Sequence, residues 1–170
     1  MAKPKYAWRK FIEHHKLLLT MSENLLKIIP EQPVCIPESE AQIVASGFLK
    51  SLVAENCEVQ SKVSKEIEFV DAGGNFENVS CSTCGKEISG EWWSTAMDKA
   101  HQSQFSQLDI VVPCCNSKTT LNQLNYNWAQ GFAKFVLTAR NPNISELDKQ
   151  SVIELEKILG CKLRLIWAHY

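Results

Sequence analysis

Hydrophobic residues along the chain recur with a helical period in some stretches and alternate with polar residues in others. Between residues 6 and 29 they recur every three or four positions until Pro30, which predicts an N-terminal helical extension over residues 1–30. A second helix is predicted from residue 39 to about Leu52. Its predicted inward stripe comprises Ala41, Val44, Ala45, Phe48 and Leu52.

Shorter hydrophobic stretches predict strands on both sides of the later helices. Residues 34–36 and 57–70 flank the second helix, and residues 132–140 and 163–170 flank a third helix that starts at Ser145 and ends at a Gly160 cap. Strand, helix and strand, repeated twice, is the order of a ferredoxin-like sheet, in which two helices cover one face of antiparallel strands. The predicted fold class is therefore α+β with a ferredoxin-like antiparallel sheet.

The length of the chain limits how many cores it can build. We expect one core for 170 residues, and hence a single domain over residues 1–170. Residues 31–75 and 132–170 form its two α/β halves. Residues 76–131 lie between the halves and hold four of the seven cysteines, so they are predicted to form an inserted zinc-binding lobe.

The cysteines of the insertion have the spacing of metal ligands. Cys81 and Cys84 are separated by two residues and followed by Gly85, and Cys114 and Cys115 come later in the insertion. Two intervening residues let both sulfurs point at one tetrahedral ion, and a glycine tolerates the positive φ of such a turn. The four cysteines are predicted to hold a structural Zn²⁺, because four thiolates leave no position for water or substrate.

Residues 79–88 resemble the zinc knuckle of zinc-ribbon proteins, and that resemblance implies structural zinc without any particular activity. The second pair departs from the ribbon pattern, since adjacent side chains of an extended segment point to opposite sides. Both Cys114 and Cys115 can bind only if the chain turns sharply between Pro113 and Ser117. Three cysteines with His101, a redox-active pair and no metal remain alternatives. The insertion and the C-terminal half also resemble small uncharacterised bacterial proteins, which implies no activity.

Composition narrows the range of functions and of locations. Eighteen Lys and Arg stand against nineteen Asp and Glu, so the chain lacks the overall basic charge that most nucleic-acid binders carry. An odd cysteine count, the absence of a signal-peptide pattern and the absence of a long apolar run predict a cytoplasmic protein that does not enter a membrane. The cysteines outside the insertion are interpreted as buried hydrophobic residues: Cys35, Cys57 and Cys161.

A helix is predicted between the two cysteine pairs, over residues 91–101, with Trp93, Met97 and Ala100 facing the core. The sequence contains none of the common catalytic motifs. We therefore expect a non-enzymatic zinc protein that acts by binding another protein, as an adaptor, an inhibitor or an immunity-type factor.

Two other functions remain open. The first is an enzyme whose active site involves Trp92, Asp98 and His101. The second is a nucleic-acid binder that uses the basic arm from Lys3 to Lys16.

Overall fold

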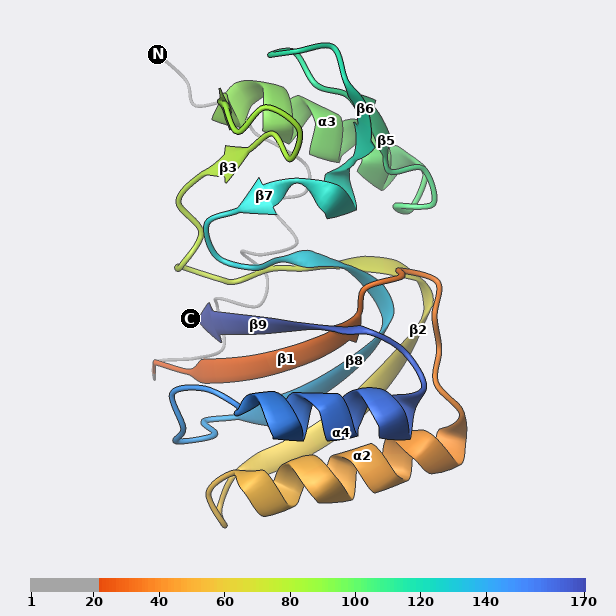
Figure 1. The fold of residues 1–170 in the computed structure, drawn as a ribbon, viewed down its shortest axis with the longest axis vertical. Helices are drawn as coiled ribbons and strands as arrows, with labels where there is room; N and C mark the ends of the chain where they lie inside the picture. Colours follow the sequence, from red (N-terminus) through yellow and green to blue (C-terminus); the bar gives the residue numbers. More distant parts are fainter. Residues whose placement is uncertain (1–21) are drawn as a thin grey trace.

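Four antiparallel strands form the main sheet of the computed structural model, which describes residues 22–170 (Figure 1). Their order in the sheet is β2-β8-β1-β9, and each strand is antiparallel to its neighbours. The strands are β1 (Asn24–Pro30), β2 (Glu58–Val70), β8 (Gly131–Arg140) and β9 (Leu163–His169). The fold class is thus α+β, as predicted, and three of these strands lie close to their predicted positions.

Two helices, α2 (Ser39–Leu52) and α4 (Lys149–Leu159), lie side by side on one face of this sheet (Figure 1). Helix α4 begins later than predicted, because the carboxylate of Asp148 accepts a hydrogen bond from the Ser151 amide and acts as the N-cap. It ends at Gly160, whose φ of 70° confirms the predicted C-cap. No helix within residues 22–170 combines the length and the apolar character needed to cross a bilayer.

The prediction of a helix reaching residue 30 is wrong, because residues 24–30 are strand β1. This strand lies between β8 and β9 and pairs with both. Its hydrophobic side chains are buried on both faces of the sheet: Leu26 and Ile28 on the helix side, Ile29 on the other. The rest of the predicted extension, residues 1–21, lies outside the described residues, and so does the basic arm from Lys3 to Lys16.

Two further details differ from the sequence prediction. Residues 34–36 form no strand, and Val34 and Ile36 are exposed. In α2, Ala45 and Leu49 are buried against the sheet, whereas Val44 belongs to the outward face rather than to the inward stripe. The helix is therefore rotated relative to the prediction.

Residues between β2 and β8 form a lobe that lies beyond the sheet on the side away from α2 and α4 (Figure 1). Its helix α3 (Gly90–Gln102) confirms the helix predicted between the cysteine pairs. Two small sheets accompany α3, with strand orders β4-β3-β7 and β5-β6. The short elements are β3 (Val79–Ser80), β4 (Glu87–Ile88), β5 (Asp109–Val111), β6 (Lys118–Thr120), the 3₁₀ turn η1 (Leu121–Gln123) and β7 (Asn125–Tyr126).

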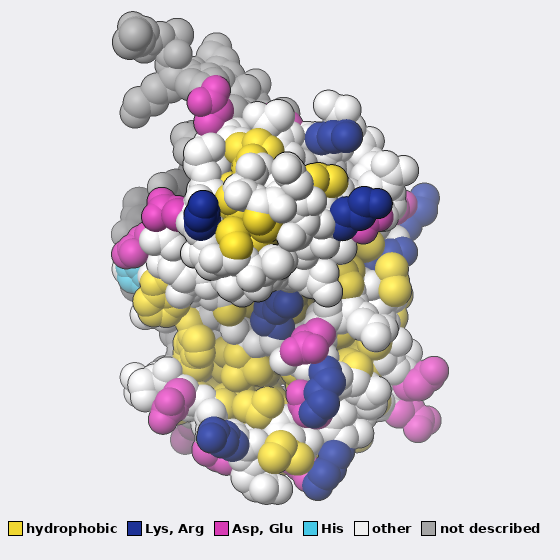
Figure 2. Space-filling model, turned by 45° about the horizontal axis from the view of Figure 1, so that its top comes forward, with side chains coloured by type: hydrophobic (Ala, Val, Ile, Leu, Met, Phe, Trp, Pro, Cys, Tyr) yellow, Lys and Arg dark blue, Asp and Glu magenta, His cyan; other side chains and the backbone are white. Residues whose placement is uncertain are grey.

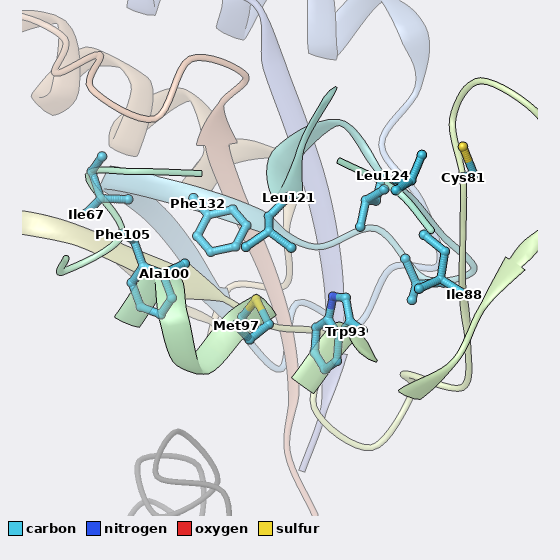
Figure 3. Close-up of a cluster of buried hydrophobic side chains, with 12 residues drawn as sticks. Ile67, Cys81, Ile88, Trp93, Met97, Ala100, Phe105, Leu121, Leu124 and Phe132 are labelled. Atoms are coloured by element: carbon cyan, nitrogen blue, oxygen red, sulfur yellow. The ribbon is translucent and has the colours of Figure 1, made fainter. Parts of the chain in front are cut away.

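The core of the lobe is continuous with the sheet (Figure 3). Trp93 and Met97 of α3 are buried, as predicted, and share one hydrophobic cluster with Ile67 of β2 and Phe132 of β8. The rings of Phe105 and Phe132 lie 5.2 Å apart between centroids. A change that unfolds the lobe therefore removes packing from the sheet as well.

A polar network around Arg164 also joins the lobe to the sheet. The Arg164 Nη1 atom donates hydrogen bonds to the Asn122 carbonyl (3.0 Å), the Asn122 Oδ1 atom (3.0 Å) and the Gln130 carbonyl (2.7 Å). Gly131 leaves room for these groups, because an added Cβ would lie 2.9 Å from Arg164 Nη1 and 2.8 Å from Ile29 Cδ1.

We expect Gly131→Ala to lower the free energy of unfolding by about 1–3 kcal/mol, because the new methyl group displaces the Arg164 network and Ile29. Chemical denaturation measures this loss. Gly47→Ala is the matched control: nothing lies within 4 Å of the added Cβ on α2, so alanine should raise the same free energy by about 0.5–1 kcal/mol. Equal effects of the two substitutions would contradict the close packing at Gly131.

Candidate metal centre

The first cysteine pair lies in a tight turn between strands β3 and β4. The Cys81 amide donates to the Lys86 carbonyl at 2.9 Å, and the Gly85 amide donates to the Cys81 carbonyl at 2.9 Å. Gly85 has a φ of 72°, the left-handed conformation that the sequence predicted for this glycine. The turn directs both sulfurs to the same side of the hairpin.

The second pair lies in a turn of the same form between strands β5 and β6. The Val112 amide donates to the Ser117 carbonyl at 3.0 Å, and the Asn116 amide donates to the Val112 carbonyl at 3.0 Å. Asn116 has a φ of 56°, so it takes the left-handed position that Gly85 takes in the first turn. The chain therefore makes the sharp bend that binding by both adjacent cysteines requires.

The backbone hydrogen bonds of the two turns follow the same pattern, so each residue of the first turn has a counterpart in the second. Cys115 corresponds to Cys84, and Val112 corresponds to Cys81. Cys114 stands at the position of Thr83, between the two places where the first turn carries its thiols. Val112 is fully buried, like Cys81, and both belong to the core of the lobe. The second turn thus has the same backbone hydrogen bonds as the first, but its two thiols stand at adjacent positions.

All four sulfurs converge in one small group that can hold a metal ion. The Sγ atoms of Cys81, Cys84, Cys114 and Cys115 lie within 4.8 Å of one another. Three of the separations are 3.4 Å from Cys84 to Cys114, 3.7 Å from Cys81 to Cys115 and 4.0 Å from Cys114 to Cys115. The residues predicted as ligands from the sequence are therefore the ones that the fold brings together.

Local hydrogen bonds bias two of the thiols toward the charged form that metals bind. Backbone N–H groups, first that of Cys84 and then that of Thr83 at 3.4 Å from the sulfur, lower the pKa of Cys81 to about 6. The hydroxyl of Ser117, 3.2 Å from the sulfur, lowers the pKa of Cys115. Burial, together with the neighbouring thiols, raises the pKa of Cys114 to about 12. A bound cation would displace the remaining protons.

His101 does not join this group. It lies in the last turn of α3, is exposed, and packs edge-on against Phe105 with the ring centroids 5.5 Å apart. Within residues 22–170, no hydrogen bond or ion pair links His101 to Asp98. Trp92 is half-buried against the core of the lobe. The structure therefore shows no acid–base pair among these residues.

The three remaining cysteines are only partly the buried hydrophobic residues that the sequence predicted. Cys57 is buried, whereas Cys35 and Cys161 are half-buried. The thiols of Cys35 and Cys161 are neighbours, and burial followed by this contact raises the pKa of Cys161 to about 12. The sequence does not predict this contact, because the two cysteines are far apart along the chain. The fold brings them together by placing the segment after β1 beside the connection from α4 to β9, where the Glu31 amide donates to the Lys162 carbonyl at 2.9 Å.

Comparison of the chain with protein-family models, with curated proteins and with solved structures finds no match.

Proposed function

We propose that the four cysteines bind one structural Zn²⁺ and that the protein acts without catalysis, by binding another protein. The arrangement of the sulfurs is the observation that carries this proposal. A Zn–S bond of about 2.3 Å implies a separation of roughly 3.8 Å between ligands at the corners of a tetrahedron. The separations of 3.4, 3.7 and 4.0 Å lie around that value, and all four sulfurs lie within 4.8 Å of one another.

Several properties of the group favour zinc in a structural role. Thiolates are soft ligands that suit Zn²⁺, and four of them complete its coordination, so no open position remains for a substrate. The first turn, with its left-handed glycine, is similar to a zinc-ribbon knuckle. A cytoplasmic location fits this proposal, because reducing conditions keep such thiols free of disulfides.

The scaffold that presents the lobe is proposed to be a single ferredoxin-like domain. The order β2-β8-β1-β9, with the first and third helices of the described chain on one face, supports this assignment. In that scheme residues 76–131 are an insertion between the second and third strands. The hydrophobic cluster shared by Ile67, Phe132 and the lobe supports one domain rather than two.

Exposed hydrophobic residues on and before α2 support a protein-binding role. Ile43 is 72% exposed and Val44 is 55% exposed on this helix, and Val34 and Ile36 are exposed in the segment that leads into it. Residues 31–44 also hold Glu31, Glu38 and Glu40 but no Lys or Arg. A partner with an apolar patch flanked by basic residues would match this surface.

The charge distribution gives no comparable support for nucleic-acid binding by the described residues. Lys and Arg side chains are interspersed with Asp and Glu on the face shown in Figure 2, without a continuous basic stripe. A phosphate backbone needs such a stripe to gain affinity.

A crosslinking experiment tests the protein-binding role. A photoreactive phenylalanine analogue at position 43 is expected to capture one protein reproducibly in cells of the native host, because Ile43 would be covered by the partner. The same analogue at Ile153 of α4, which is 45% exposed, is the matched control. Val44→Glu, added to the protein that carries the analogue at position 43, should remove the captured partner with a change in stability of at most about 0.5 kcal/mol, because Val44 is an exposed neighbour on the same helix. Equal capture from positions 43 and 153, or none from either, would contradict the proposal.

A further inference from the structure

A groove of about 810 Å³ lies at the end of the main sheet where β9 ends, and its lining includes Trp167, Ala168 and His169. The antiparallel pairing brings segments from both ends of the chain to this place: Asn24 begins β1, and its register partner His169 ends β9. Asn141 directly follows β8, and Asn56 lies two residues before the start of β2. The groove therefore lies where the ends of several strands of the sheet meet. None of the four cysteines lines it.

The groove is lined mainly by uncharged polar side chains, together with one histidine, His169. Five of the side chains that line it are asparagines: Asn24, Asn56, Asn75, Asn141 and Asn143. None of its lining residues, all within the described part of the chain, is Asp, Glu, Lys or Arg. A strongly charged ligand would find no Asp, Glu, Lys or Arg side chain there to pair with, so the groove favours a neutral ligand with many hydrogen-bonding groups.

Internal hydrogen bonds orient three of the asparagines and leave half of each amide free. The Asn24 Oδ1 atom lies 2.9 Å from His169 Nδ1, and the Asn75 Nδ2 atom donates to the Trp167 carbonyl at 3.0 Å. The Asn141 Oδ1 atom accepts from the Asn24 amide at 3.0 Å. Their other amide atoms have no partner within residues 22–170, and neither have the side chains of Asn56 and Asn143. An amide offers both donors and acceptors, which matches the two roles of a hydroxyl group.

Two tryptophans supply an apolar surface among these amides. Trp128, from the segment between β7 and β8, is 42% exposed, and Trp167 of β9 is half-buried. An indole ring combines a broad apolar face with one polar N–H group. The C–H groups on one face of a pyranose ring stack on such a surface, while its hydroxyl groups bond to neighbouring amides.

The backbone around the groove is held in place before any ligand arrives. Asn141 and Asn143 have φ angles of 51° and 55°, a region that non-glycine residues seldom occupy. The Asn141 amide donates to the Asn24 carbonyl at 2.7 Å, and the Ala54 amide donates to the buried Pro142 carbonyl at 3.1 Å. A wall that is ordered in advance loses little entropy on binding.

We propose that this groove binds a neutral saccharide, which stacks on Trp128 and hydrogen-bonds to the asparagines. This inference is independent of the zinc site and of the apolar surface on α2. An oligonucleotide is disfavoured because no Lys or Arg side chain lines the groove to meet its phosphates. A peptide finds amides here but little of the enclosed apolar space that its side chains would need.

Titration of the full-length protein with cellohexaose, chitohexaose and maltohexaose tests the proposal, with the indole N–H resonances of Trp128 and Trp167 as the readout. At least one hexasaccharide is expected to shift these resonances saturably at millimolar concentration. Trp128→Ala should weaken that binding about tenfold. Asn143→Gly should weaken it too, since glycine keeps the positive φ and removes only the amide. Ile153→Ala, away from the groove, should leave it unchanged.

Two further probes complete the test, tetra-alanine and a thymidine decamer. The proposal is overturned if none of the three hexasaccharides shifts the tryptophan resonances, or if either of these probes does so more strongly than every saccharide. It is also overturned if Trp128→Ala and Asn143→Gly both bind like the unmodified protein. Retention of the remaining amide resonances shows that each variant is folded.

Discussion

Cys84→Ser is expected to release the metal and to unfold the lobe between β2 and β8. A hydroxyl group is a poor substitute for a thiolate, and a structural zinc site contributes on the order of 10 kcal/mol to folding. Because the core of the lobe includes Phe132 and Ile67, the sheet should also lose stability. Elemental analysis should find about one zinc per chain in the unmodified protein and far less in the variant. Thermal melting should show an earlier and broader transition.

Cys57→Ser is the matched control, because Cys57 is a buried cysteine in the core beneath α2 and far from the lobe in the fold. It should keep its zinc and lose only about 1–3 kcal/mol, the usual effect of burying a hydroxyl group in an apolar site. Equal losses of stability in the two variants would contradict the distinction between ligand and core cysteines. A metal-free preparation that melts as cooperatively as the loaded one would contradict the structural role of zinc.

Local sequence patterns were sufficient to predict several elements of the fold. The residues of β9 and the helix α3 were predicted correctly, because their hydrophobic positions recur with the period of the element. Strand β1 was not, because its hydrophobic residues on the two faces of the sheet, among them Leu26, Ile28 and Ile29, follow one another closely and continue the hydrophobic positions before them. A strand of that kind reads as a continuous hydrophobic run, which fits the end of a helix equally well.

The orientation of α2 shows a second limit of sequence patterns. Ile43, Val44 and Ala45 are consecutive hydrophobic residues, so periodicity alone leaves the direction of the helix open. Contact with the sheet decides that Ala45 is inside and that Ile43 and Val44 are outside. Exposed hydrophobic residues can be identified only when the fold is known. Here Ile43 and Val44 belong to the surface that is proposed to bind a partner.

The candidate metal site was predicted as a set of residues but not as a geometry. The spacing of Cys81 and Cys84 indicates one half of the site, because two intervening residues are enough to define the turn. The adjacent Cys114 and Cys115 define no turn by themselves. Only the backbone hydrogen bonds of Val112 and Asn116 show that the second half repeats the first, with valine at one thiol position.

The equivalence of the two turns predicts how zinc affinity changes when Cys114 is replaced. The single variant Cys114→Ser is expected to bind zinc about a hundredfold more weakly or worse, because one of four ligands that share the binding energy is lost. The double variant Val112→Cys with Cys114→Ser should recover most of that affinity. Residue 112 is buried in the lobe core as Cys81 is, on a backbone of the same form, so a thiol there should reach the ion. Competition with a chromophoric chelator measures both affinities.

His101→Ala serves as the control for this series and should bind zinc like the unmodified protein, because His101 lies outside the group of four sulfurs. A double variant as weak as Cys114→Ser would show that the two turns are not interchangeable at this position. Weak binding by His101→Ala, together with normal binding by Cys114→Ser, would replace Cys114 with His101 as the fourth ligand. The unmodified protein and His101→Ala should therefore bind most tightly and the double variant almost as tightly. Cys114→Ser should bind most weakly, since it alone has three thiolates rather than four within reach of the metal.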